Sequence, residues 1–283
     1  MHPASKVTSV LQLAAVQAQG WGHPITSGSR TIHYFFGAEG MEPSGNEMHY
    51  SEQLLRFPGT GLHYDVPLAL HDGQRLYDSL ELPQDRPLLL SLQSTFKYVP
   101  ANDWTFAAIA ADHPEALILL VGHMGHGGIA ERLQQRLAAQ FADRGLEIAN
   151  HLRILPRLDY GDFMGLFGIA HHTIDTIDWN GGNSSFQSLS LDCPVVTFPT
   201  TYMRGRHTVA MLRELEIPEL IAHSREEYVA ISGRLLADQA FYTNIKTRIR
   251  DRKQRLFHDK RVQEAFQITV ETICRQAPQP DAH

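Results

Sequence analysis

The sequence predicts an α/β fold built around a parallel β-sheet. After residue 87, short apolar runs rich in Leu, Ile and Val alternate with longer segments of helical pattern. The first apolar run, at 88–92, follows a polar stretch at 82–87 that contains two prolines and is typical of a linker. We therefore place a domain boundary after residue 82.

The elements after this boundary follow the order of β-α-β units. The strands after the first one are predicted at 116–121, 151–155, 173–177 and 194–198. The helices are predicted at 104–111, 129–145, 160–170, from about residue 183, and at 226–238. This alternation predicts a Rossmann-like domain at 83–277 that includes the C-terminal helices. Residues 1–82 are expected to form short strands and loops, and 278–283 a disordered tail.

The composition argues against several classes of function. The 283 residues are 43% hydrophobic and carry a formal net charge of -6, which supplies no basic field for nucleic acid. The basic stretch at 244–260 is expected to be a solvated helix face. No segment approaches the roughly 18 apolar residues of a membrane span, and the two cysteines cannot form a disulfide framework. We expect a soluble, cytoplasmic protein without a nucleic-acid or membrane partner.

Histidines are numerous, but their spacing does not predict a metal site. The chain has 16 of them, including His123 with His126 and the adjacent pair His171 and His172. His123 and His126 stand among glycines, with no carboxylate or cysteine at a recognisable ligand spacing. We therefore predict that no metal is bound.

The candidate chemistry lies in a glycine-rich turn at 178–186, which follows a predicted strand and opens a predicted helix. Gly181 and Gly182 allow the backbone to approach an anion closely. Asn183 or Ser184 can cap the helix, whose free N–H groups and dipole then face the anion. In a parallel sheet this turn lies at the carboxyl edge of the strands, where ligands usually bind. The turn indicates a phosphate site, although an ordinary helix start shares the pattern.

Lys97 is the candidate cation for this phosphate site. A helix dipole contributes roughly 0.3 to 1 kcal/mol per charge, which is too little to hold a diphosphate alone. Lys97 comes just after the first strand of the Rossmann-like domain, and the strand ends of such a sheet converge on one edge. The alternative is a solvated surface lysine.

Six short blocks recur in the order and spacing of a known family. They are WGHPITSG at 21–28, YSE at 50–52, SLQSTFKY at 91–98, WNGGNSS at 179–185, PVVTFP at 194–199 and MRGR at 203–206. With these blocks the chain resembles the C-terminal catalytic region of the protein O-GlcNAc transferase and SPINDLY family, glycosyltransferase family 41, in its bacterial branch. The first two blocks resemble the closing segment of the family's N-terminal catalytic lobe.

This resemblance implies a GT-B fold, in which 83–277 binds the donor and 1–82 is the closing part of the N-terminal catalytic lobe. It implies transfer of a GlcNAc-like sugar from a nucleotide diphosphate donor, UDP-linked, to a protein acceptor through an O-linkage, with no metal or other cofactor. Carried over by position, Lys97 contacts the donor diphosphate and is the catalytic residue. The implied donor-binding residues are Lys97, Gly181, Gly182, Asn183, Ser184, Gln187, Tyr160 and Arg206.

The sequence also departs from the family pattern. Gln187 replaces an acidic residue that holds the ribose, and Phe163 replaces a histidine of the animal enzymes. Tyr160 as a packing aromatic and Arg206 as a structural ion-pair residue remain alternatives. The family's N-terminal lobe begins well upstream of the segment that residues 1–64 resemble. A truncated, non-catalytic module that binds a nucleotide or a protein is therefore the second hypothesis.

Overall fold

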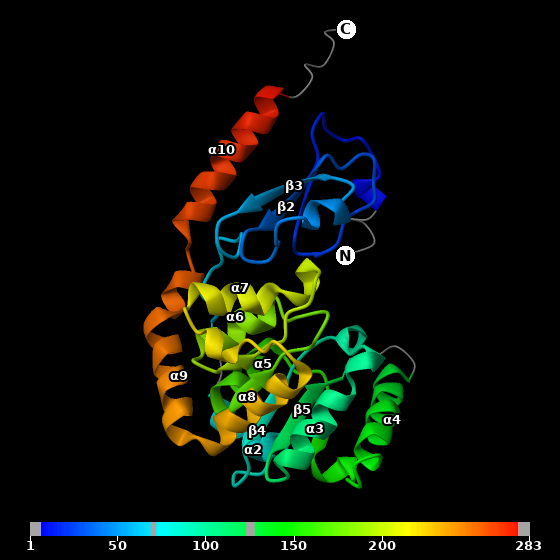
Figure 1. Cartoon of the computed structure of the whole chain (residues 1–283), viewed down its shortest axis with the longest axis vertical. Helices are drawn as coiled ribbons and strands as arrows, with labels where there is room; N and C mark the ends of the chain where they lie inside the picture. Colours follow the sequence, from blue (N-terminus) through cyan, green and yellow to red (C-terminus); the bar gives the residue numbers. More distant parts are fainter. Residues whose placement is uncertain (1–6, 69–71, 123–127, 277–283) are drawn as a thin grey trace.

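The computed structural model describes residues 7–68, 72–122 and 128–276, which form two parts (Figure 1). The smaller part is a parallel sheet in the order β1 (Ala18–Gly20), β2 (Tyr34–Ala38) and β3 (Gln53–Phe57). The larger part is a parallel sheet in the order β6 (Leu152–Leu155), β5 (Leu117–Val121), β4 (Leu88–Ser91), β7 (His172–Ile174) and β8 (Val195–Val196). The predicted parallel α/β architecture is confirmed, and this strand order is that of a Rossmann-like domain.

Helices connect the strands of the large sheet and continue after the last one. They are α2 (Leu76–Ser79), α3 (Trp104–Asp112), α4 (Ile129–Ala142), α5 (Tyr160–Ile169), α6 (Asn183–Ser190), α7 (His207–Glu214), α8 (Arg225–Ala237), α9 (Gln239–Arg252) and α10 (Lys260–Gln276). The helices predicted from periodicity all form, with shifts of a few residues at their ends. The strand predicted at 173–177 ends at Ile174 instead; the Asp175 N–H still donates to the carbonyl oxygen of Val196 at 3.0 Å, and its side chain accepts from the turn that follows.

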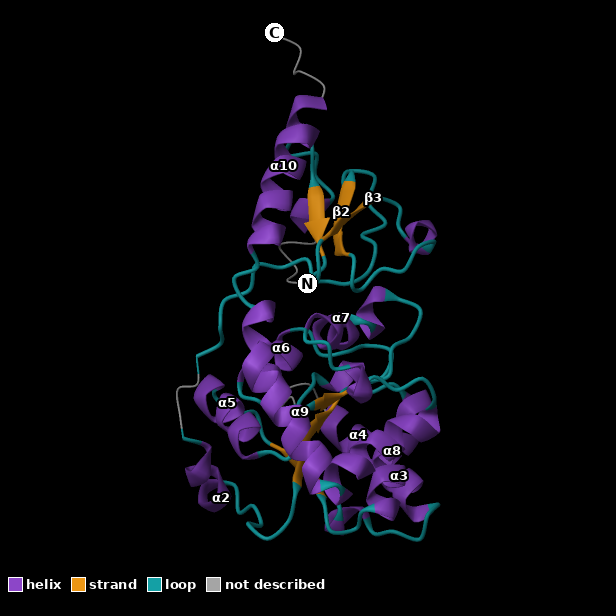
Figure 2. Ribbon diagram, turned by 60° about the vertical axis from the view of Figure 1, so that its left-hand side comes forward, coloured by secondary structure: helices purple, strands orange, loops and turns teal. Residues whose placement is uncertain are grey.

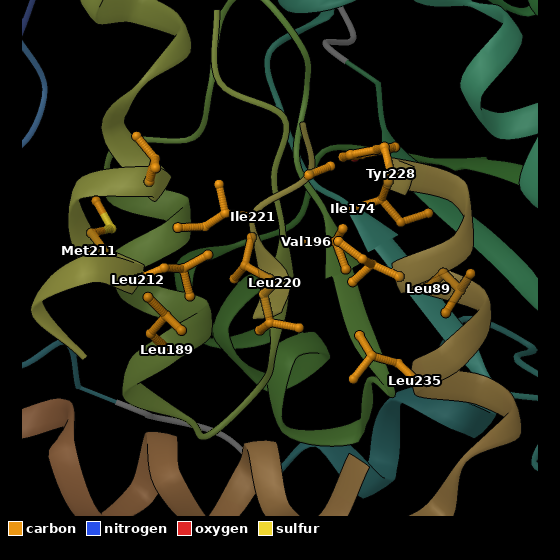
Figure 3. Packing of buried hydrophobic residues seen from close by; sticks show 14 of the residues in the cluster. Leu89, Ile174, Leu189, Val196, Met211, Leu212, Leu220, Ile221, Tyr228 and Leu235 are labelled. Carbon is orange, nitrogen blue, oxygen red and sulfur yellow. The ribbon is translucent and has the colours of Figure 1, made fainter. Parts of the chain in front are cut away.

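The large sheet is buried on both faces, as its uninterrupted apolar runs predicted. Leu88 and Leu90 of β4 enter one core cluster with side chains of α2 and α5, whereas Leu89 enters the other cluster. Figure 2 shows α2 and α5 on one side of the strands and α3, α4 and α8 on the other. Figure 3 shows the second cluster, in which Leu89, Ile174 and Val196 pack against leucines of α6, α7 and α8. These two layers hold the carboxyl ends of the strands in fixed positions.

Gly73 provides a stability test of this packing. A Cβ atom there would lie 2.3 Å from the carbonyl oxygen of Gly165 in α5, so backbone would have to move. We expect Gly73→Ala to lower the free energy of unfolding by about 1 to 3 kcal/mol, measured by urea denaturation. The control is Gly168→Ala. Gly168 lies in α5, as Gly165 does, but it faces open space, so this substitution should stabilise the protein by about 0.5 to 1 kcal/mol. Equal effects of the two substitutions would contradict the close packing.

The basic stretch at 244–260 lies at the surface as predicted, with the side chains of Arg250 and Arg255 62% and 47% exposed, but its cations are also paired. It spans the end of α9, a 3₁₀ turn at Lys253–Leu256 and the start of α10. Its cations pair with acidic residues of the large part: Arg248 with Glu219, Arg250 and Lys253 with Asp192, and Arg252 and Arg255 with Glu216. These pairs could not be predicted, because a charge pattern along one helix does not show which acidic residues fold against it.

Helix α10 returns to the N-terminal part of the chain, where Figure 1 shows it beside the small sheet. Phe266 of α10 contacts Phe36 and Phe57, with ring centroids 5.8 and 5.9 Å apart. The predicted domain at 83–277 contained this helix, but in space α10 covers the aromatic face of the small sheet. The boundary after residue 82 stays a prediction. Within the described residues, we find no helix with the length and apolar character that crossing a membrane requires.

Candidate functional site

A cleft of about 590 Å³ lies between the two parts, at the carboxyl ends of β4 and β7. We call it the central cleft. Trp21 to Pro24 of the small part line one side, and residues that follow β4 and β7 line the other. The chain leaves β4 toward β5 on one side and leaves β7 toward β8 on the other, so these adjacent strands form the topological switch point. Ligands of open α/β sheets bind at such a point.

The glycine-rich turn and α6 form the floor of the central cleft. Gly182 is the N-cap residue of α6, and no side chain caps this helix. The expected cap by Asn183 or Ser184 is therefore wrong, because both residues already lie inside the first helical turn. A helix start without a side-chain cap leaves N–H groups for an anion in the cleft. A Cβ atom at Gly181 would lie 2.5 Å from Ser184 Oγ, so this position requires glycine for close packing.

Lys97, which follows β4, contacts the same turn. Its Nζ donates to Gln93 Oε1 and to the carbonyl oxygen of Asn180, each at 2.9 Å. Gln93 Nε2 in turn donates to Ser184 Oγ at 2.6 Å. Burial lowers the pKa of Lys97, while the nearby Asp175 carboxylate favours the charged form. Lys97 is thus a half-buried cation at the cleft, and the alternative of a solvated surface lysine is wrong.

Asp175 is a site residue that sequence reasoning missed. Its buried carboxylate accepts hydrogen bonds from the Gly181 N–H at 2.7 Å, Thr208 Oγ1 at 2.5 Å and Thr197 Oγ1 at 3.0 Å. Burial raises the pKa of Asp175 to about 6, against the opposing effect of these donors and of Lys97. An acidic residue at the end of an apolar run could have indicated this role. Asp175 was not considered, because the predicted strand at 173–177 placed it inside a core element.

The structure brings together most of the donor-binding residues that the sequence predicted. Lys97, Gly182, Asn183, Ser184 and Gln187 line the central cleft, and Gly181 packs directly beneath Ser184. The cleft is also lined by aromatic residues and histidines outside the predicted donor-binding set, among them Trp21, Phe96, Trp179 and His207. Trp21 opens one of the six blocks that carry the family resemblance, but the sequence did not show that it reaches the cleft, because the small part approaches the turn only in the folded protein.

Tyr160 and Arg206 do not line the central cleft. Tyr160 is the first residue of α5, and its side chain is 46% exposed. Arg206 donates from Nε to the carbonyl oxygen of Met41 and from Nη1 to that of Thr200, each at 3.1 Å. Arg206 therefore connects the small part to the large part. This role is structural, as in the alternative of a structural ion-pair residue, although its partners are carbonyl oxygens.

The histidines considered as metal ligands fall into two groups. His123 and His126 lie outside the described residues. His171 and His172 contact each other through Nδ1 at 2.9 Å, and burial lowers the pKa of His171 to about 4. Within residues 7–68, 72–122 and 128–276, one group of three candidate ligands lies close together, formed by exposed His63, Asp65 and His258. None of the three lines the central cleft.

Comparisons with known proteins agree with this geometry. Residues 166–265 match the family model described as glycosyl transferase family 41. A probable UDP-N-acetylglucosamine–peptide N-acetylglucosaminyltransferase SPINDLY of Petunia hybrida is 23% identical over 249 residues, which cover 84% of this chain and 25% of that protein. A UDP-N-acetylglucosamine–peptide N-acetylglucosaminyltransferase of Caenorhabditis elegans is 32% identical over 169 residues, which cover 60% of this chain and 14% of that protein.

The fold has a similar counterpart among solved structures. A mutant O-GlcNAc transferase of Thermobaculum terrenum superposes with a TM-score of 0.75 at 22% identity, over 93% of this chain and 50% of that one. This likeness confirms the predicted GT-B fold. The chain spans about a quarter of the length of the Petunia relative and half of the solved chain. The predicted family is confirmed, while its bacterial branch stays a prediction. Residues 166–265 are thus a glycosyl transferase family 41 segment, in agreement with the relatives and the solved structure.

Proposed function

We propose that this chain is the donor-binding part of a glycosyltransferase. In this proposal the enzyme moves a GlcNAc-like sugar from a UDP-linked donor to a hydroxyl group of a protein acceptor. The observation that carries it is the convergence of Lys97 and the uncapped start of α6 on one cleft at the switch point of the sheet. The names of the relatives, which join UDP-N-acetylglucosamine to a peptide acceptor, supply the donor and acceptor classes.

The proposed chemistry is stabilisation of a leaving group. When the bond between sugar and nucleotide breaks, negative charge grows on the nucleoside diphosphate. The Lys97 ammonium and the N–H groups at the start of α6 lie in fixed positions where they stabilise that charge. Lys97 thereby takes the part that a divalent cation plays elsewhere, and the proposal includes no metal ion or other cofactor.

The remaining predicted residues are assigned by their places in the cleft. Gly181, Gly182, Asn183 and Ser184 cradle the diphosphate, since they form the turn and the start of α6. Gln187 lies about one helical turn after Ser184 in α6. In the proposal its amide donates a hydrogen bond to a ribose hydroxyl or accepts one from it. The positions of Tyr160 and Arg206 do not support direct donor contacts, so we leave both outside the proposed site.

Two further elements of the proposal concern the surroundings of the enzyme. The net charge of -6 disfavours nucleic acid as a partner, which leaves the nucleotide sugar and a protein acceptor. Both cysteines are free, as is usual in a reducing compartment, and we propose a cytoplasmic location.

Two measurements test the proposed function. Calorimetric titration with UDP should show one binding site, because the diphosphate has a cation and free N–H donors to contact. Release of UDP from a panel of UDP-sugars, with a protein acceptor present, then separates the enzyme from the truncated binding module. Binding without UDP release would favour the module, and absence of UDP binding would reject the proposed donor site.

A further inference from the structure

His207 lies at the central cleft as the first residue of α7. His207 is only 3% exposed; the Asn180 backbone lies near its ring, but neither ring nitrogen makes a hydrogen bond of good geometry with a described residue. A buried polar group without a partner costs about 1 to 3 kcal/mol. An imidazole in this position therefore suits a ligand that enters the cleft and supplies the missing partner.

Two neighbours hold the imidazole in place. The Trp21 ring stacks on it, with centroids 4.8 Å apart and planes at 28°. Trp21 is itself fixed, because its Nε1 donates to the carbonyl oxygen of Thr60 at 3.0 Å. The same indole lies 3.5 Å from the place of a Cβ atom on Gly182, so the imidazole is close to the turn at the start of α6.

The charge state of His207 limits what it can bind. Burial lowers the pKa of His207 to about 3, and the positive charge of Lys97 acts in the same direction, opposed by the nearby Asn180 backbone. At neutral pH the ring is uncharged, with one N–H donor and one acceptor nitrogen. It can therefore donate a hydrogen bond to an anion beside Lys97 without adding a second charge.

We propose that His207 is a further donor-binding residue, whose ring N–H donates a hydrogen bond to a diphosphate oxygen of the nucleotide sugar. The diphosphate is the favoured partner because the imidazole lines the same cleft as Lys97 and Gly182 and stacks on the indole that borders Gly182. This inference rests on the proposed function and adds a neutral donor to it.

The test compares UDP binding by the wild-type chain and four variants, measured by calorimetry. His207→Phe keeps the stacked ring but removes both nitrogens, and we expect it to weaken UDP binding about tenfold or more. His207→Asn and His207→Gln place an amide N–H near Nδ1 and Nε2 respectively, so one of them should stay within about threefold of wild type. His151→Phe is the matched control, since His151 is also buried with an unpaired Nδ1 but lies outside the cleft.

The outcomes separate this inference from the proposed function. UDP affinity of His207→Phe within about twofold of wild type would overturn the role of His207 while the donor site stands. Equal losses in the Phe, Asn and Gln variants would assign the effect to packing and would also overturn it. If His207→Phe does not fold, as judged by thermal unfolding, the Asn and Gln variants decide: near-wild-type affinity in one and a loss in the other supports the role of His207, and equal affinities in both overturn it. A wild-type chain that does not bind UDP would reject the proposed function itself.

Discussion

Lys97→Ala is expected to lower the rate of UDP release from a UDP-sugar by about 100- to 1000-fold, at saturating donor and acceptor. The substitution removes the one side-chain cation that the proposal places at the leaving diphosphate. Charge on that group would then be stabilised only by uncharged N–H donors, chiefly the start of α6, whose dipole contributes roughly 0.3 to 1 kcal/mol. The rate should be measured in single turnovers, so that slow product release does not mask the chemical step.

The control for this prediction is Lys260→Ala, which removes an exposed lysine at the start of α10. We expect it to leave UDP release unchanged. Lys97→Ala should also retain a cooperative thermal transition, because the Gln93 and Asn180 groups that it frees border the cleft and can contact water. A transfer rate equal to wild type would refute the role of Lys97.

Asp175→Ala is expected to destabilise the protein by about 2 to 4 kcal/mol, measured by urea denaturation. It leaves the Gly181 N–H and the hydroxyl groups of Thr197 and Thr208 without their acceptor in a buried region. Because Gly181 lies in the turn, UDP binding should weaken as well. Asp175→Asn keeps one acceptor oxygen and should lose less stability than the alanine variant. Equal stability of wild type and Asp175→Ala would show that the network does not hold the turn.

Comparison of wild type with Asp175→Asn also tests how the free energy of unfolding depends on pH. The pKa of Asp175 is 3.8 in its ordinary state and about 6 in the folded protein, so the folded state binds the proton more tightly. The stability from this proton is fully present below pH 3.8 and is lost as the pH rises through about 6. The free energy of unfolding of wild type, minus that of Asp175→Asn, should therefore fall by up to about 1.4 kcal/mol per pH unit in this window. A difference that rises with pH would contradict the buried environment of Asp175.

The local pattern of the chain predicted the elements of the large part well. The apolar run of β4 and the helical period of α3, α4 and α5 depend on neighbouring residues, so they can be read without the rest of the fold. The same applies to the glycine-rich turn, whose backbone demands are local. Lys97 could be added because parallel strands end at one edge of a sheet, which is a rule of topology rather than of side-chain contact.

Other features depended on contacts between residues far apart in the chain. The basic residues of α9 were correctly placed at the surface, but their partners Glu216, Glu219 and Asp192 lie too far along the chain to be predicted. Arg206 was assigned to the donor, yet its guanidinium is used between the carbonyl groups of Met41 and Thr200. In each case the charge was visible in the sequence and its partner was not.

The sequence by itself determined the parallel α/β architecture and the glycine-rich turn, because hydrophobic period and turn chemistry act locally. Its six blocks carried the resemblance to the family, and the topology of parallel sheets paired Lys97 with the turn. Only the tertiary structure decided that Asp175 holds the turn, that Trp21 covers His207, and that α10 returns to the small sheet. These features come from burial and hydrogen bonding between segments that meet only on folding. Burial sets the charge of Asp175 and His207, so their chemistry cannot be predicted from residue type alone.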